Sequence, residues 1–109
     1  MANTYLVLSQ TKPSATTLTD SYTVPGATSA TVSSLVVCNQ SATATSFRIS
    51  VAVAGAADNT KQYLYYDVPI NGNDTFIATV GITLATTDVI RVYATLATLS
   101  FNFYGVQLT

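Results

Sequence analysis

Residues 61–80 read KQYLYYDVPINGNDTFIATV and show the pattern on which the whole chain is built. Two runs of strand-forming residues flank an Asn-Gly-Asn-Asp connection, a composition typical of a turn. Successive side chains of a strand point to opposite faces. The first run therefore predicts two facing sets, with Leu64, Tyr66 and Val68 on one side and Tyr63, Tyr65 and Asp67 on the other. The second run, from Phe76 to Val80, resumes the same period, so we predict a β-hairpin over 61–80.

Similar runs recur along the chain. Strands are predicted at about 4–9, 18–24, 30–39, 45–54, 61–68, 74–80, 88–95 and 98–108. Val, Thr, Ile, Tyr and Phe dominate these runs and suit a pleated surface, and no window shows sustained helical spacing of apolar residues. Short strands separated by turn residues are typical of sandwiches and barrels. We predict an all-β fold, an antiparallel β-sandwich of about eight strands of jelly-roll type.

The length of the chain predicts a single domain. A sequence of 109 residues has room for one hydrophobic core, so residues 1–109 are expected to form one β-sandwich domain. Within it, residues 1–17 are expected to provide an N-terminal strand plus an arm. The apolar run 5–8 is too short for a signal core or a membrane span, and no basic leader precedes it. We expect synthesis in a cytoplasm and no membrane partner.

Two strands predict the core. Phe47, Ile49, Val51 and Val53 alternate with small or polar residues, which places Arg48 on the outside. The last strand puts Phe101 and Phe103 on one face, with Gly105 marking a bulge or a close approach. We expect the core to contain Phe47, Ile49, Val51, Phe101 and Phe103.

The run Ser33–Cys38 is apolar on both faces at its end. Such a run predicts a central strand covered on both sides, with Cys38 as a small buried hydrophobe.

Charge is scarce, and its scarcity predicts self-association. Charged residues make up 8% of the chain, against roughly 25% in an ordinary soluble domain. Charge keeps domains apart in solution, and the cores of protein–protein interfaces are depleted in it. We predict a homo-oligomer, a dimer or a trimer. The four basic residues, Lys12, Arg48, Lys61 and Arg91, are scattered, so no basic stripe predicts a nucleic-acid partner.

The reactive side chains offer little for catalysis. The chain has no His and no Glu, so Cys38 lacks the imidazole that usually activates a catalytic thiol. The five Asp residues mostly stand at strand ends, where Asp caps turns. Asn71–Asp74 gathers oxygen atoms but lacks the spaced carboxylates of a calcium loop, which leaves calcium a minor alternative. We predict no catalytic residues, no metal site and no cofactor, and therefore not an enzyme.

Tyrosines within the first run of the 61–80 segment suggest a binding surface. Tyr63 and Tyr65 could stack on a sugar or anchor a protein interface, because an amphipathic ring serves both. The interface is the better supported alternative, since the chain has no Trp. Tyr66, on the opposite face, is expected in the core. The candidate interface residues are Tyr63, Tyr65, Arg48 and Arg91.

Several stretches resemble small virion structural proteins of tailed bacteriophages. They are YLYYDVPI, NDTFIATVGITL, DVIRVYA and SFNFYGVQL, together with SYTVPGATSATVSSLVVCN upstream. The similarity covers Tyr22–Pro25, Ser33–Asn39, Tyr63–Ile70, Asn73–Leu84 and Asp88–Tyr93. These are fold-type motifs and carry over no catalytic residue. The resemblance implies a non-enzymatic part of the particle, either a capsid decoration (cement) protein or a small tail component.

Two functions follow as expectations. The first is a virion structural protein that decorates and stabilises the capsid, located in the virion. Its partners would be its own copies and the major capsid protein or another virion protein. The alternative is a tail-associated receptor- or carbohydrate-binding module.

Overall fold

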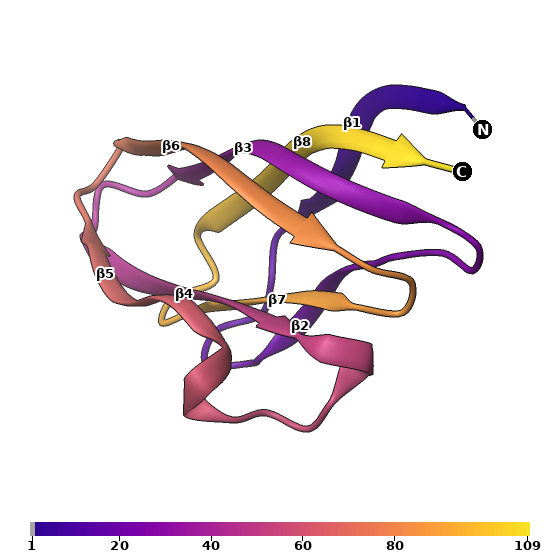
Figure 1. Cartoon of the computed structure of the whole chain (residues 1–109). Coiled ribbons are helices and arrows are strands. Elements are labelled where there is room, and N and C mark those ends of the chain that lie inside the picture. Colours follow the sequence, from indigo (N-terminus) through magenta and orange to yellow (C-terminus); the bar gives the residue numbers. More distant parts are fainter. Residues whose placement is uncertain (1) are drawn as a thin grey trace.

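Eight strands form two antiparallel four-stranded sheets that pack face to face in the computed structural model, which describes residues 2–109 (Figure 1). The strands are β1 (Asn3–Thr11), β2 (Thr19–Thr23), β3 (Ser29–Asn39), β4 (Thr45–Ala52), β5 (Tyr63–Ile70), β6 (Thr75–Leu84), β7 (Val89–Ala94) and β8 (Leu99–Leu108). Two short 3-10 helices, η1 (Val53–Gly55) and η2 (Thr60–Gln62), lie between β4 and β5. The predicted all-β sandwich of eight antiparallel strands is confirmed.

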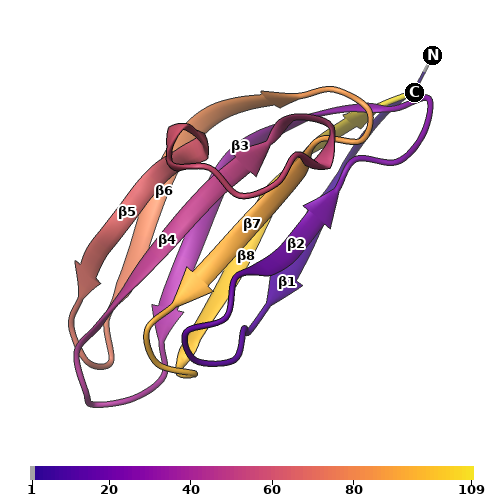
Figure 2. The same cartoon turned by 90° about the horizontal axis from the view of Figure 1, so that it is seen from below.

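The strand order shows how the chain is folded across the two layers. Sheet A has the order β1-β8-β3-β6 and sheet B the order β2-β7-β4-β5. Figure 2 shows the two layers from below, with the termini at one end. The chain pairs β1 with β8, β2 with β7, β3 with β6 and β4 with β5, like one long antiparallel ribbon that is bent across both sheets. The jelly-roll type stays a prediction.

The predicted hairpin over 61–80 is wrong. β5 pairs with β4 in sheet B and β6 pairs with β3 in sheet A, so the connection 71–74 crosses between the layers. The neighbouring connection holds it there: the backbone N–H of Asn73 donates to the carbonyl of Ser41 at 2.8 Å. A Cβ on Gly72 would lie only 2.1 Å from the carbonyl oxygen of Ala42, so only glycine fits this close approach.

β5 does not keep a simple two-residue alternation. Val68 pairs with Phe47 and Tyr65 with Ile49, so β5 has one residue more than β4 over this interval. The extra residue is accommodated at Asp67, whose φ of 53° marks a β-bulge. Both predicted facing sets of this strand are therefore wrong, because the bulge changes which side chains point inward.

The core lies between the sheets and contains the predicted residues. Phe47, Ile49, Phe101 and Phe103 are fully buried, and Val51 packs against them while half-buried. Val53, which the alternation placed on the inward face, is 69% exposed, so that part of the prediction is wrong. β4 ends at Ala52, and Ala54 then takes φ 55°, so the alternation does not continue into η1.

β3 is a central strand, as predicted, but it is not covered on both sides. A two-layer sandwich covers one face of each sheet, so Leu35 and Val37 are buried while Val36 and Cys38 are half-exposed on the outer face. The prediction of a buried Cys38 is therefore wrong. Near the far end of β8, a Cβ on Gly105 would lie 2.0 Å from the carbonyl oxygen of Thr31, which confirms the predicted close approach.

The N-terminal segment is a strand followed by a connection that is attached to the domain. β1 pairs with β8 along its length. After it, Pro13 is buried, and the backbone N–H of Thr16 donates to the carbonyl of Ala94 at 2.8 Å. The connection 12–18 thus runs beside the end of β7, in place of the arm expected there.

Candidate functional site

Polar and aromatic side chains gather on the outer face of sheet B. Arg48 on β4 stands opposite Tyr93 on β7, and both point outward because their strand neighbours Phe47 and Val92 fill the core. The bulge in β5 brings Tyr66 and Asp67 to the same place, opposite Arg48. Together with Tyr63, these residues form what we call the arginine–tyrosine cluster: Arg48, Tyr63, Tyr66, Asp67 and Tyr93.

The guanidinium of Arg48 lies at the centre of this cluster. Its Nε donates to Asp67 Oδ1 at 2.7 Å and its Nη2 to Asp67 Oδ2 at 3.3 Å, a two-pronged ion pair. Its Cζ lies 4.2 Å from the centroid of the Tyr66 ring and 4.6 Å from that of Tyr93. Both are cation–π distances. The charge of Arg48 is thus neutralised and its position fixed within the chain.

Tyr63 extends the cluster toward the edge of the sheet. Its ring meets the Tyr66 ring edge to face, with centroids 5.2 Å apart. Its hydroxyl donates to Asp58 Oδ1 at 2.8 Å. Tyr66 itself is 54% exposed, so the predicted core position of Tyr66 is wrong and its ring is open to a ligand or a partner.

The electrostatics keep Arg48 charged and Tyr63 protonated. The hydrogen bond to Asp67 raises the pKa of Arg48, so the guanidinium stays charged. Burial, and then the hydrogen bond to Asp58, raise the pKa of Tyr63, so the phenol keeps its proton well above neutral pH. Neither group takes up or releases a proton near neutral pH. The cluster is suited to contact and stacking.

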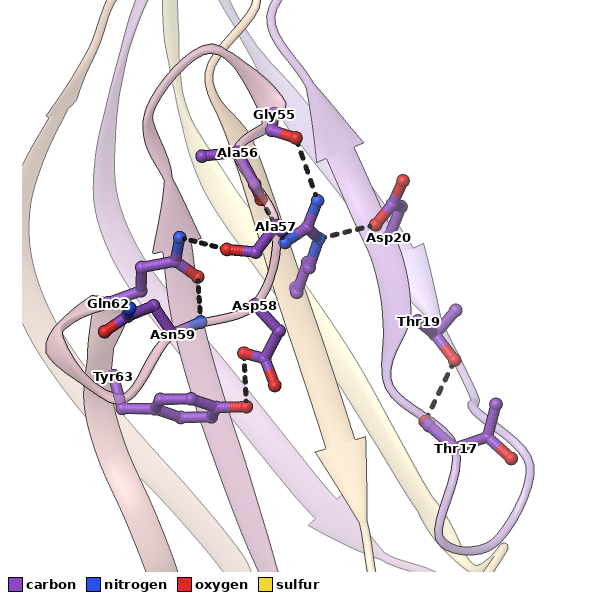
Figure 3. A network of polar contacts seen from close by, with 11 residues as sticks. Thr17, Thr19, Asp20, Gly55, Ala56, Ala57, Asp58, Asn59, Gln62 and Tyr63 are labelled. Atoms are coloured by element: carbon purple, nitrogen blue, oxygen red, sulfur yellow. Dashed lines mark hydrogen bonds and ion pairs between the residues drawn. The ribbon is translucent and has the colours of Figure 1, made fainter.

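Arg91 belongs to a different network, which fixes the loop 53–62 (Figure 3). It forms an ion pair with Asp20 at 2.9 Å and donates to the carbonyls of Ala56 at 2.8 Å and Gly55 at 3.3 Å. The side chain of Gln62 closes the same loop through the carbonyl of Ala57 and the backbone N–H of Asn59 (Figure 3). The loop thereby covers part of sheet B, and Ser50 and Ala52 are buried although their strand neighbours Ile49 and Val51 already fill the inner face.

The structure brings together two of the four predicted interface residues. Arg48 and Tyr63 join the cluster, and Arg91 lies on the adjacent strand but is engaged by the loop. Tyr65 is not at the surface site, because its ring packs inward against Phe47 and Phe76.

Sequence reasoning missed Tyr66 and Tyr93. Tyr93 had a usable signal, since it stands two residues from Arg91 in a regular strand and must share its face. Tyr66 had none, because the bulge that turns it outward breaks the alternation.

The carboxylates have structural partners. Asp74 accepts from the backbone N–H of Thr75, and buried Asp88 accepts from those of Ala54 and Ala85, which confirms the predicted turn role for these two. Asp20 and Asp67 instead pair with arginines. Among residues 2–109, no three Cys or Asp side chains lie close enough together to hold a metal ion.

The outer face of sheet A has the opposite character. None of its four strands contains a charged residue. On this face Val36 lies between Ile77 of β6 and Asn102 of β8, and Ile77 is 68% exposed. We call this surface the uncharged face. The charged residues within strands all lie in sheet B, so the sandwich has two chemically distinct outer faces.

No protein-family model matches this chain, and no curated protein matches its sequence. In residues 2–109 the structure contains no helix that is both long and apolar enough to cross a membrane. The two outer faces of the sandwich are therefore its candidate functional surfaces.

Proposed function

We propose that the chain is a non-enzymatic virion structural protein, a capsid decoration protein that binds an assembled shell and stabilises it. The observation that carries the proposal is the uncharged face. A surface without charges can be buried against another protein with no cost for desolvating ions, whereas a face that carries ion pairs cannot.

The size of this face suits a docking role. Four strands about 4.8 Å apart and about ten residues long, at about 3.3 Å per residue, cover on the order of 600 Å². That is close to the roughly 800 Å² per partner of a specific interface. The strand order favours the jelly-roll type, which occurs in viral capsid and lectin domains.

The stabilising mechanism is burial combined with mass action. Each Å² of apolar surface removed from water contributes about 25 cal/mol, although ordering the partners absorbs much of the gain. A protein that binds only the assembled shell shifts the equilibrium toward that shell. In this proposal the partners are the major capsid protein, or another virion protein, and other copies of the chain, and the location is the virion.

The experiment compares particles with and without the protein. Particles that lack it should assemble but release their genome at a lower temperature or under milder osmotic shock, and adding the protein back should restore their resistance. Rebinding should depend weakly on salt, because surface charge pairs contribute little and are screened. The Ile77→Lys variant should rebind at least about tenfold more weakly, while Val53→Lys, at an equally exposed valine away from this face, should rebind normally.

The arginine–tyrosine cluster favours a second candidate, a tail-associated receptor- or carbohydrate-binding module. Its exposed Tyr66 ring, set beside Tyr63 and the fixed Arg48, offers a flat apolar surface with polar groups at its rim. Glycan-array binding that disappears in Tyr66→Ala would support this candidate. Depleted particles that are as robust as complete ones but no longer attach to cells would decide for it and against decoration.

A further inference from the structure

β1 is one of the two edge strands of sheet A, and its first half is exposed on both faces. Tyr5 is 81% exposed, Leu6 36% and Val7 47%, although neighbouring side chains of a strand point to opposite sides. Figure 1 shows this part of β1 next to the end of β8, where N and C lie together. The covering strand in sheet B, β2, has only five residues and does not reach along the whole of β1.

The hydrogen-bonding groups of this edge can be assigned from the β1–β8 pairing. The backbone N–H of Ala2 donates to the carbonyl of Thr109, and the N–H of Thr109 donates back, both at 3.0 Å. Hydrogen-bonded pairs alternate in an antiparallel ladder. Asn3, Tyr5 and Val7 therefore direct their N–H and C=O groups away from β8, to the side on which the described chain places no strand.

The edge lacks the features that usually protect a strand from pairing with another chain. Natural edges carry charges, proline, strong bulges or covering segments, or are very short. β2 is short and contains Asp20, and β5 contains Pro69 and the bulge at Asp67. β6, the other edge of sheet A, has an extra residue between Thr79 and Ile82, opposite Val32–Ser34 of β3. β1 is nine residues long, with no charge and no proline, and is regular before its irregularity between Val7 and Ser9.

We propose that β1 pairs antiparallel with β1 of a second copy, so that two copies form a two-fold dimer with sheet A continuous across it. Tyr5 then faces Tyr5 of the other copy, and Asn3 of each copy faces Val7 of the other. Every free N–H and C=O of these three residues gains a partner in this register.

A second copy fits this edge better than a charged partner. The segment meets only uncharged residues when it meets itself, so no ion is desolvated, and an isologous pairing closes at two copies. The pairing involves fewer residues than the 20–30 a side of a standard interface, so we expect a dissociation constant in roughly the micromolar range. The inference does not depend on the proposed virion role.

Sedimentation velocity from about 1 to 300 μM, a range that brackets micromolar affinities, tests the proposal with the purified chain. The wild type should convert from monomer to dimer. Tyr5→Lys and Tyr5→Glu should each remain monomeric, because like charges face each other across the two-fold axis, whereas an equimolar mixture should dimerise again. Val53→Lys and Ile77→Lys should dimerise like the wild type.

Several outcomes would overturn the proposal. A wild-type monomer throughout the range, or a trimer, contradicts a closed pair of β1 edges. A dimer that Ile77→Lys dissociates and Tyr5→Lys does not would place the interface on the uncharged face. Thermal unfolding of each variant separates lost pairing from lost folding. The backbone groups of Tyr5 point away from β8, so a substitution there leaves the hydrogen bonds between β1 and β8 in place.

A cross-link checks the register without introducing charge. In a Cys38→Ser background, Tyr5→Cys should form a disulfide-linked dimer on mild oxidation. The Cα atoms of a hydrogen-bonded antiparallel pair lie about 5.5 Å apart, within the range of about 4.4–6.8 Å for disulfides. Val53→Cys in the same background is the control and should remain uncross-linked at the same protein concentration. Equal cross-linking of both variants would count against the pairing.

Discussion

Phe47 joins the two sheets and offers a direct test of how they pack. It is fully buried on β4 of sheet B. Its ring centroid lies 5.3 Å from that of Phe76 on β6 and 5.9 Å from that of Phe101 on β8, both in sheet A. It also lies 6.3 Å from the ring of Tyr65 in its own sheet. Shortening this side chain removes contacts from both layers at once.

The expected loss follows from the size of the cavity and the lost ring contacts. Phe47→Ala should lower the free energy of unfolding by about 3–5 kcal/mol, with the ring pairs placing it near the upper end. That is a large share of the roughly 5–15 kcal/mol that stabilises a domain. Phe47→Leu fills most of the volume but loses the ring pairs, so we expect a loss of about 1–2 kcal/mol.

Urea unfolding, followed by tyrosine fluorescence, measures both losses. The midpoint should fall while the slope with urea stays unchanged, because the surface exposed on unfolding is nearly the same. Val53→Ala is the control, a hydrophobic residue that is 69% exposed, and should cost less than about 1 kcal/mol. A loss under about 1 kcal/mol for Phe47→Ala, or an equal loss for Val53→Ala, would refute this account of the core.

Three further predictions address single interactions. Asp88→Asn should cost about 1–3 kcal/mol in urea unfolding, because an amide NH₂ then faces a backbone N–H; an unchanged midpoint would contradict it. Gly105→Ala should destabilise by more than about 2 kcal/mol, since its methyl group would meet the carbonyl of Thr31, and wild-type stability would mean that the strands can separate there. The pKa of Tyr63 is raised above 10.0 by burial and by Asp58, so its contribution is complete below that pH and is lost as the pH rises above it. Tyr63→Phe should therefore unfold with a weaker dependence on alkaline pH, and identical pH profiles would contradict this.

Much of the fold could be predicted because strand propensity and alternation are local properties. All eight strands were found, and the inward faces of β4 and β8 were assigned correctly through Phe47, Ile49, Phe101 and Phe103. Alternation shows which side of a strand is buried, but it carries no information about the neighbouring strand. The prediction of a hairpin over 61–80 is wrong for that reason, since β5 and β6 belong to different sheets.

The candidate site was predictable only where the strands are regular. Arg48 could be placed outside, because β4 alternates without interruption. Tyr65 faces the core and Tyr66 faces outward, the reverse of the prediction, because one extra residue at Asp67 changes which of them points inward. A bulge of this kind depends on how the strand pairs with its neighbour, and no residue type in YLYYDV indicates it.

The sequence by itself determined the all-β class, the number of strands, the main core residues and the scarcity of charge, since each of these depends on residue type and short-range spacing. Only the tertiary structure decided that the few charged strand residues lie together in sheet B, leaving sheet A uncharged and the β1 edge open. Strands far apart in the chain, such as β1 and β8 or β3 and β6, become neighbours through backbone hydrogen bonds. Those bonds are the same for every residue type except proline, so the order of strands in a sheet cannot be read from local composition.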